Sequence, residues 1–253
     1  MRAVVGSKTT SLLGQYWDIR RRLGQCRDLP TTHRRLVIEM YWSSPIILYC
    51  ERTDSSFWSE PINALTNGAF LIVAALAFAL WRRRGDRDPA TLSLIIVTAL
   101  IGIGSFVFHT LATKGAVLLD VIPIALFVYG YLYLALRRFL HLQQLASAAI
   151  LSAFIVASQG VSLALPPDLL NGSCEYLLPL AALIAVGVIA RFNHMGFSIL
   201  LAAAIFLVSL VFRTIDQAAC GNFPSGTHFI WHLLNAGVLY ILLRTAVVAK
   251  EPN

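Results

Sequence analysis

The stretch LIIVTALIGIGSFVFHTLATKGAVLLDVIPIALF, residues 94–127, decides the fold of this chain. A short polar break at Thr113-Lys114-Gly115 separates two apolar runs, and each run extends further on its outer side. Both are long enough to cross a bilayer core, which takes about 20 residues of helix. The stretch therefore predicts a hairpin of two membrane helices. Ser105, His109 and Asp120 are among the polar side chains that interrupt its apolar surface.

Similar apolar runs continue along the rest of the chain. Its residues are 57% hydrophobic and 13% charged, whereas roughly a quarter of the residues in an average soluble domain are charged. Seven long apolar segments are predicted to span a membrane: residues 62–81, 91–112, 117–136, 144–164, 175–190, 195–212 and 227–248. We expect an all-α, multi-pass membrane protein with seven transmembrane helices in one domain, residues 40–253.

The loop charges predict the orientation. Nine Lys and Arg fall in one set of loops: Arg82, Arg83, Arg84, Arg87, Arg137, Arg138, Arg191, Arg244 and Lys250. Three fall in the opposite set: Arg52, Lys114 and Arg213. Because Lys and Arg are enriched in cytoplasmic loops, the C-terminus is predicted to be cytoplasmic and the N-terminus non-cytoplasmic.

Residues 1–39 do not fit this orientation. They carry eight Lys and Arg against three acids, which accounts for +5 of the net charge of +7. The segment lacks the apolar region of a secretory signal peptide. Our hypothesis is that residues 1–39 are a disordered or non-native extension, with Met40 as the natural start. The rest of the chain is nearly balanced and has no nucleic-acid motif, so we expect no nucleic-acid partner.

The polar residues of the opening stretch are predicted to lie at one depth. Ser105 and His109 share a helix face because they are four residues apart, and Asp120 falls in the first turn of the next helix. The stretch GTHFIWH, residues 226–232, opens the seventh span and places His228 and His232 on one face. By the topology, all five side chains converge near the non-cytoplasmic face.

Three converging histidines predict a metal centre. Three His ligands with an open fourth position are typical of catalytic zinc, so His109, His228 and His232 are the candidate zinc ligands. The alternative is that these histidines form hydrogen bonds between helices. An aspartate in mid-membrane costs about 2.5–3.5 kcal/mol and usually has a partner or a role. Asp120 and Ser105 are therefore the candidate catalytic residues.

The segment YCERTDSSFWSEPINALTN, residues 49–67, brings acids to the same side of the bundle. Glu51, Asp54 and Glu60 are candidate ligands of calcium, which prefers carboxylate and carbonyl oxygens. The alternative is that they face water or pair with Arg52. Pro61 fits the first turn of a helix, where no backbone donor is needed, and this places Glu60 at the N-cap.

Three of the four cysteines, Cys50, Cys174 and Cys220, are predicted on the non-cytoplasmic, more oxidising side. A disulfide between two of them is plausible. We favour Cys50–Cys220, which joins the segment before the first span to the loop before the seventh. Sequence does not fix the pairing, and reduced cysteines are the alternative. Arg213 and Asp216, three residues apart, predict a local ion pair.

Taken together, the motifs resemble the alkaline ceramidases, a family of seven-helix membrane hydrolases. The residues that carry the resemblance run through the whole membrane domain: Cys50-Glu51, the stretch EPINALTN at 60–67, Gly104-Ser105, His109, Asp120, His228 and His232. The sequence of these motifs is closer to that of prokaryotic members than to that of the animal enzymes. The family's disulfide matches Cys50 and Cys220.

The resemblance implies roles for individual residues. His109, His228 and His232 would bind Zn²⁺, and Ser105 and Asp120 would complete the site. Relatives hold Ca²⁺ in the acidic segment before the first helix, which Glu51 and Glu60 match. The relatives' upstream acid and tryptophan are replaced here by Leu48 and Tyr49, for which Asp54 would compensate.

The implied function is zinc-dependent hydrolysis of the N-acyl amide of ceramide within the membrane, giving a sphingoid base and a fatty acid. The expected partners are a membrane lipid substrate and the bilayer, the cell membrane in a prokaryote, without an obligate protein partner. Two alternatives stay open. One is a hydrolase of another N-acyl lipid or a lipid ester, and the other is a non-catalytic zinc-containing receptor or sensor like the adiponectin-type receptors.

Overall fold

The structure is a computed structural model that describes residues 39–85, 88–166, 168–192 and 194–249. The hypothesis about residues 1–39 falls outside the described residues except for Glu39, which opens a helical turn over residues 39–42. The main helices are α3 (Pro61–Thr66), α4 (Gly68–Arg84), α5 (Pro89–Leu111), α6 (Lys114–Arg138), α7 (Gln144–Ala164), the 3₁₀ helix η1 (Leu169–Tyr176), α8 (Leu177–Ile189), α9 (His194–Ala219) and α10 (His228–Val248).

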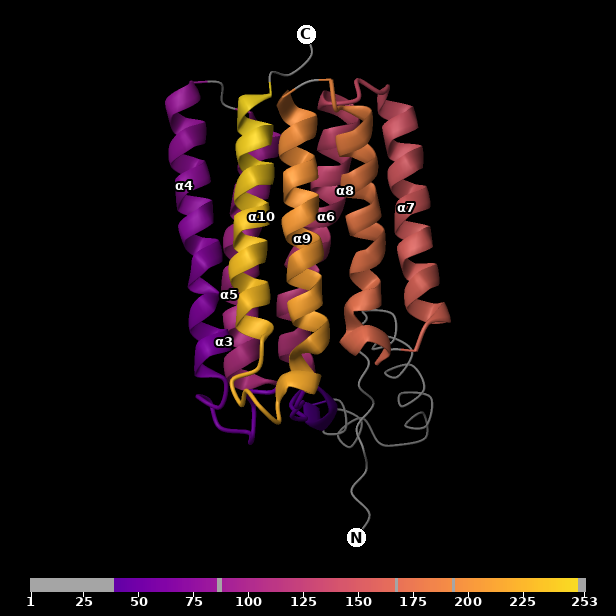
Figure 1. Ribbon diagram of the computed structural model, residues 1–253. Helices are drawn as coiled ribbons and strands as arrows, with labels where there is room; N and C mark the ends of the chain where they lie inside the picture. The colour runs from indigo at the N-terminus through magenta and orange to yellow at the C-terminus, as the bar shows by residue number, and fades with distance from the viewer. Residues whose placement is uncertain (1–38, 86–87, 167, 193, 250–253) are drawn as a thin grey trace.

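Within the described residues, seven helices are long and apolar enough to cross a membrane, as predicted. They stand side by side as one bundle (Figure 1). The first span joins α3 and α4, whose boundary lies at Asn67, and the fifth joins η1 and α8. Around the bundle α4 packs on α5, α5 on α6, α8 on α9, and α9 on α10, which returns to α4.

Burial follows the pattern of a membrane protein. Large apolar side chains such as Leu71, Ile72 and Ile103 face outward, where lipid tails solvate them. Polar side chains gather inside the bundle, and Asn63 and Thr98 are fully buried there. A buried polar group needs a partner or a function, so the interior is where a site is expected.

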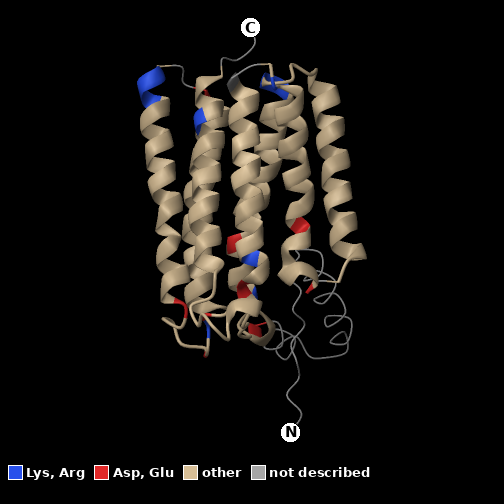
Figure 2. Cartoon of the chain, viewed as in Figure 1, with Lys and Arg blue, Asp and Glu red and all other residues tan. Residues whose placement is uncertain are grey.

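The two ends of the bundle differ in charge. Figure 2 shows most Lys and Arg at the end where the C-terminus lies and most Asp and Glu toward the opposite end. This distribution agrees with the loop charges read from the sequence. Which end of the bundle faces the cytoplasm stays a prediction from the loop charges.

The α5–α6 hairpin is tighter than predicted. Lys114 and Gly115 belong to α6, and the turn consists of Ala112, with φ at 42°, and Thr113. The Thr113 hydroxyl accepts a hydrogen bond from the Ala116 N–H at 3.2 Å and so caps α6. The segment at Pro45 pairs with Thr113 in an antiparallel bridge. This pairing lays the chain before the first span across the end of the hairpin.

The sixth span is longer than predicted. The apolar pattern predicts its end at residue 212, but α9 continues to Ala219. The extra two turns carry Arg213 and Asp216 into the bundle, where they are 5% and 0% exposed. Both charged residues are therefore part of the interior.

Candidate metal centre

His109 lies in the last turns of α5 and is buried. Its Nδ1 lies 2.6 Å from the Glu60 Oε2. An ionised carboxylate can only accept, so the imidazole donates from Nδ1 and keeps its lone pair on Nε2. The Nε2 atom is buried and has no hydrogen-bond partner. A carboxylate on one imidazole nitrogen and a free lone pair on the other is typical of a metal-binding histidine.

The charge of Glu60 is stabilised by its neighbours. Burial opposes ionisation, but the hydrogen bonds from His109 and Arg52 and the positive charge of Arg52 outweigh it and hold the pKa of Glu60 below its usual range. The Arg52 Nε donates to the other carboxylate oxygen, Oε1. Glu60 therefore remains an acceptor that fixes the tautomer of His109.

His232 is oriented by a hydroxyl. Its Nδ1 lies 2.9 Å from the Thr66 Oγ1. The single hydrogen of the Thr66 hydroxyl is directed at the carbonyl oxygens of Ile62 and Asn63, which lie 2.8 and 3.0 Å from Oγ1. Its oxygen must therefore accept from the Nδ1–H of His232, which leaves the lone pair on Nε2.

His228 is held by an aromatic ring. Its imidazole stacks on the Tyr49 ring, with centroids 3.6 Å apart and planes at 17°. The Nδ1 of His228 is buried and has no hydrogen-bond partner. Burial raises the pKa of Tyr49 above its ordinary value, so this tyrosine stays neutral beside the imidazole.

The three imidazoles converge as predicted. One ligand nitrogen each from His109, His228 and His232 lies within 4.8 Å of the others, and all three side chains are at most 2% exposed. Among the described residues this is the one group of three or more His, Cys, Asp and Glu side chains whose ligand atoms meet so closely. Unpartnered buried nitrogens in such a group fit a metal ion.

Ser105 and Asp120 meet beside this cluster. The Ser105 hydroxyl lies within hydrogen-bonding reach of the Asp120 carboxylate, and His109 lies near the same carboxylate. The Asp120 Oδ1 is buried and has no hydrogen-bond partner. Gly104 allows this approach, because a Cβ there would collide with the Leu119 carbonyl. The predicted catalytic residues are therefore adjacent, with one carboxylate oxygen free.

Asp216 has a role that the sequence does not predict. Its carboxylate accepts hydrogen bonds from the backbone N–H groups of Cys50, Thr227 and His228, at 3.0, 2.7 and 3.0 Å. Gly226 passes close to it with φ at 63°, and a Cβ at this position would overlap the carboxylate. Asp216 thus fixes the N-terminus of α10, where His228 lies.

The predicted Arg213–Asp216 ion pair is wrong. The Arg213 Nη1 donates instead to the Asn171 carbonyl at 2.8 Å and the Ser173 hydroxyl at 3.0 Å. Its guanidinium lies 5.2 Å from the centre of the Tyr176 ring. The spacing of three residues did place both groups on one helix, but buried backbone groups engage each of them.

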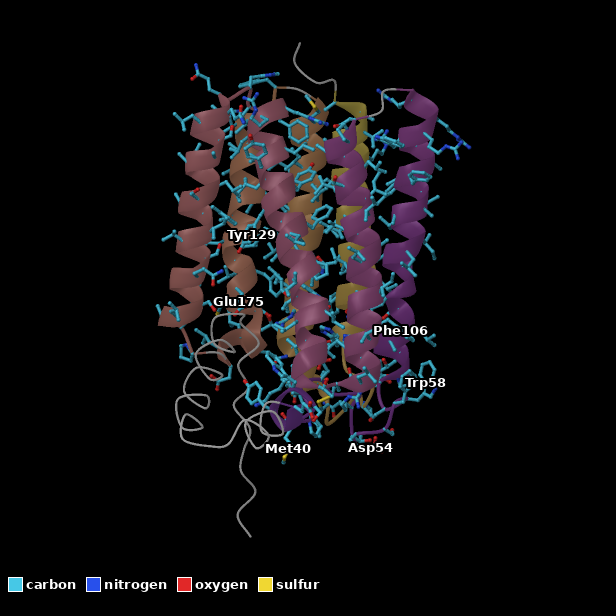
Figure 3. The ribbon with its side chains drawn as sticks, turned by 180° about the vertical axis from the view of Figure 1, so that it is seen from behind. Met40, Asp54, Trp58, Phe106, Tyr129 and Glu175 are labelled. Atoms are coloured by element: carbon cyan, nitrogen blue, oxygen red, sulfur yellow. A yellow bond between two sulfur atoms is a disulfide. The ribbon has the colours of Figure 1, made fainter. Side chains whose placement is uncertain are left out.

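The three acids predicted to bind calcium do not converge. Glu51 accepts from the backbone N–H groups of Ile62 and Asn63, at 2.7 and 2.8 Å, and so caps α3. Asp54 lies at the outer tip of the segment (Figure 3) and accepts from the Ser56 N–H and hydroxyl. Glu60 pairs with Arg52 and His109, as described above. These residues do not fit the predicted calcium site.

The favoured disulfide is present. Cys50 and Cys220 are bonded, with Cα atoms 5.4 Å apart, while Cys174 is a buried free thiol. The bond ties the segment before the first span to the end of α9. That segment carries Tyr49, which covers His228.

An apolar cavity lies next to the histidine cluster. It is lined from every span of the bundle by mostly aliphatic and aromatic side chains, including Ile101, Phe127 and Leu242. Phe70, one of its lining residues, has its ring centre 6.5 Å from that of His232. Trp231 also lines the cavity and directly precedes His232 in the chain. The cavity offers a hydrocarbon chain an apolar surface next to the polar centre.

Fold and site together define a class of protein: a seven-helix integral membrane protein with a buried three-histidine centre that could hold a metal. The family model described as Ceramidase matches residues 43–250. A search of curated proteins finds no match. The family match covers most of the 253 residues, so the chain belongs to the ceramidase family. It is a ceramidase-type hydrolase that acts on amide bonds.

Proposed function

We propose that this protein is a zinc-dependent ceramidase that works within the membrane. It hydrolyses the N-acyl amide of ceramide to a sphingoid base and a free fatty acid. His109, His228 and His232 hold Zn²⁺, with Asp120 and Ser105 beside it. The observation that carries the proposal is the convergence of three buried imidazole nitrogens within 4.8 Å.

The choice of zinc rests on the donor set. Three imidazoles suit Zn²⁺ better than they suit a hard cation that prefers oxygen. In two of them, His109 and His232, Glu60 and Thr66 engage Nδ1 and leave Nε2 for a metal. Three protein ligands leave a fourth position open. An open position is the feature that distinguishes a catalytic zinc from a structural one.

The side chains around the cluster supply the remaining chemistry. Bound zinc would polarise the amide carbonyl and lower the pKa of a water molecule toward neutrality. Asp120, with its unpartnered Oδ1, accepts the proton of the attacking water and passes it to the leaving amine. Ser105 donates a hydrogen bond to the oxyanion that develops on the carbonyl.

The apolar cavity supports a lipid substrate. A lipid amide would bind with its hydrocarbon in the cavity lined by Phe127 and Leu242 and its amide at the histidines. Such a substrate enters sideways from the bilayer and keeps its chains in hydrocarbon throughout. The charge asymmetry of the bundle supports placing the centre near the non-cytoplasmic face.

The test is fatty-acid release by purified protein from ceramides and from a panel of other N-acyl lipids and lipid esters. We expect release from ceramide, and its loss to background in His109→Ala with loss of bound zinc. His141→Asn is the matched control, because His141 is exposed and lies in the loop after α6. It should keep zinc and activity.

Two results would change the proposal. Cleavage of another N-acyl lipid or an ester in place of ceramide would keep the zinc chemistry and replace the substrate. A wild-type protein that binds zinc and cleaves nothing in the panel would refute the hydrolytic role.

A further inference from the structure

Arg52 is a buried cation whose nitrogens all donate to oxygen atoms. It lies between Cys50 and α3, and its side chain is 1% exposed. Its acceptors are one carboxylate and four backbone carbonyls: Glu60 Oε1 through Nε, the Asp54 and Ser56 oxygens through Nη1 at 3.0 and 3.1 Å, and the His109 and Thr110 oxygens through Nη2 at 2.7 and 3.4 Å.

These oxygens come from three parts of the chain. The Asp54 and Ser56 carbonyls belong to the loop before α3, Glu60 is the N-cap of α3, and the other two carbonyls end α5. A carboxylate with several carbonyl oxygens is the type of ligand set that calcium uses. Here the guanidinium lies at the centre of that set, while Glu51 and Asp54 turn to backbone and hydroxyl donors.

The charge of Arg52 suits its position. The last carbonyls of a helix carry partial negative charge, and a cation there is stabilising. A buried arginine is tolerated when a carboxylate and hydrogen bonds compensate its lost hydration, and all three nitrogens of Arg52 have acceptors. The planar, five-donor guanidinium fills such a set of oxygens better than an ammonium group would.

Arg52 contacts a predicted metal ligand by two routes. Its Nη2 donates to the backbone oxygen of His109, and its Nε holds the Glu60 carboxylate that accepts from His109 Nδ1. The first contact fixes the backbone of His109. The second holds the carboxylate that keeps the imidazole hydrogen on Nδ1. Loss of Arg52 would leave Glu60 buried with less compensation and His109 less firmly oriented.

We propose that Arg52 is a built-in cation that occupies the place expected for calcium and positions His109 for the metal. The protein then needs no calcium for stability, metal binding or activity. The proposal rests on the proposed zinc site and does not depend on which lipid is the substrate. Arg52 is a positioning residue, since it acts through Glu60 and the end of α5.

The first test uses wild-type protein loaded with zinc in calcium-free buffer. CaCl₂ is titrated to about 5 mM, above the dissociation constants of the weakest protein calcium sites. Thermal unfolding and titration calorimetry are followed. We expect no shift of the unfolding midpoint and no saturable heat. A calcium-dependent rise in the midpoint, or saturable binding, would overturn the proposal without the need for any variant.

The second test compares Arg52→Ala with Arg138→Ala, which removes the arginine of the ion pair at the other end of α5. Both variants should unfold at lower temperature. Zinc affinity, measured by competition with a chromophoric chelator, should fall about 10–100-fold in Arg52→Ala, as for loss of other partners that orient metal ligands. It should not change in Arg138→Ala.

The outcomes separate this inference from the proposed function. Equal zinc affinity in wild type and Arg52→Ala would refute the positioning role and leave the zinc site intact. A wild-type protein that binds no zinc would refute the proposed function itself. If Arg52→Ala does not fold, the calcium titration on wild type still decides the question.

Discussion

The two ends of α5 are held by the same kind of interaction but differ in what lies beside it. At the N-terminus Asp88 pairs with Arg138 at 2.5 Å and accepts from the Ala90 and Thr91 N–H groups. At the C-terminus Arg52 pairs with Glu60 and donates to the last carbonyls. Each end thus carries the charge that complements the helix dipole.

The difference lies in the neighbours. The Asp88–Arg138 pair joins the start of α5 to the end of α6. Asp88 also accepts from the backbone N–H groups of Ala90 and Thr91, and Arg138 also donates to the Thr91 hydroxyl. The Arg52–Glu60 pair ends on an imidazole whose free nitrogen faces two other histidines. We infer that the first pair contributes stability alone, whereas the second also sets the geometry of the site.

The largest effect is expected at the C-terminal end, in a residue outside either pair. Asp120→Asn should lower kcat about 10²–10⁴-fold, because the amide cannot accept the proton of the attacking water. Zinc content should be unchanged, since Asp120 is not one of the three ligands. Steady-state kinetics with metal analysis checks this. An Asp120→Asn enzyme with near wild-type kcat would refute the role of Asp120.

Breaking the Arg52–Glu60 pair is expected to have an intermediate effect. Glu60→Gln removes the charge that fixes the His109 tautomer, so zinc affinity should fall about 10–100-fold. Competition with a chelator measures it. Unchanged affinity would mean that the two ends of α5 are equivalent and that Glu60 serves stability alone.

Breaking the Asp88–Arg138 pair should have the smallest effect. Asp88→Ala removes an N-cap and should lower the free energy of unfolding by about 1–2 kcal/mol at neutral pH, with zinc affinity and kcat unchanged. A loss of zinc affinity here would contradict the comparison.

The same variant should reveal a pH dependence. Burial opposes ionisation of Asp88, but hydrogen bonds from Arg138, Thr91 and Ala90 hold its pKa at about 2, below the usual 3.8. A lowered folded-state pKa stabilises the fold above the unfolded value. The difference between wild type and Asp88→Ala should therefore be full above about pH 4 and shrink toward pH 2, as urea unfolding at several pH values would show.

Much of the fold and site could be predicted from the sequence because the signals are local. Apolar length predicted the seven spans, and spacing of four residues placed His228 and His232 on one face. The short α5–α6 connection brought Ser105, His109 and Asp120 to one level. These inferences need helix geometry and topology alone.

The sequence could not predict the hydrogen-bond and ion-pair partners of the charged side chains, because these partners come from segments that are distant in the chain. Glu51 and Glu60 look alike in sequence, but one caps α3 and the other pairs with Arg52 and His109. Asp216 lies three residues from Arg213 and instead accepts from three backbone N–H groups of distant segments. The one sequence feature that could have indicated this role is the position of Asp216 just before the loop that runs from Cys220 to Gly226.

The most direct test of zinc-dependent amide hydrolysis is removal of the metal followed by reconstitution. Zinc is stripped from purified protein, and fatty-acid release from ceramide is measured after adding Zn²⁺ or Ca²⁺ alone. We predict that Zn²⁺ restores release in proportion to the metal bound, up to one ion per chain, and that Ca²⁺ restores none. Restoration by Ca²⁺ alone, or release by protein stripped of zinc, would contradict it.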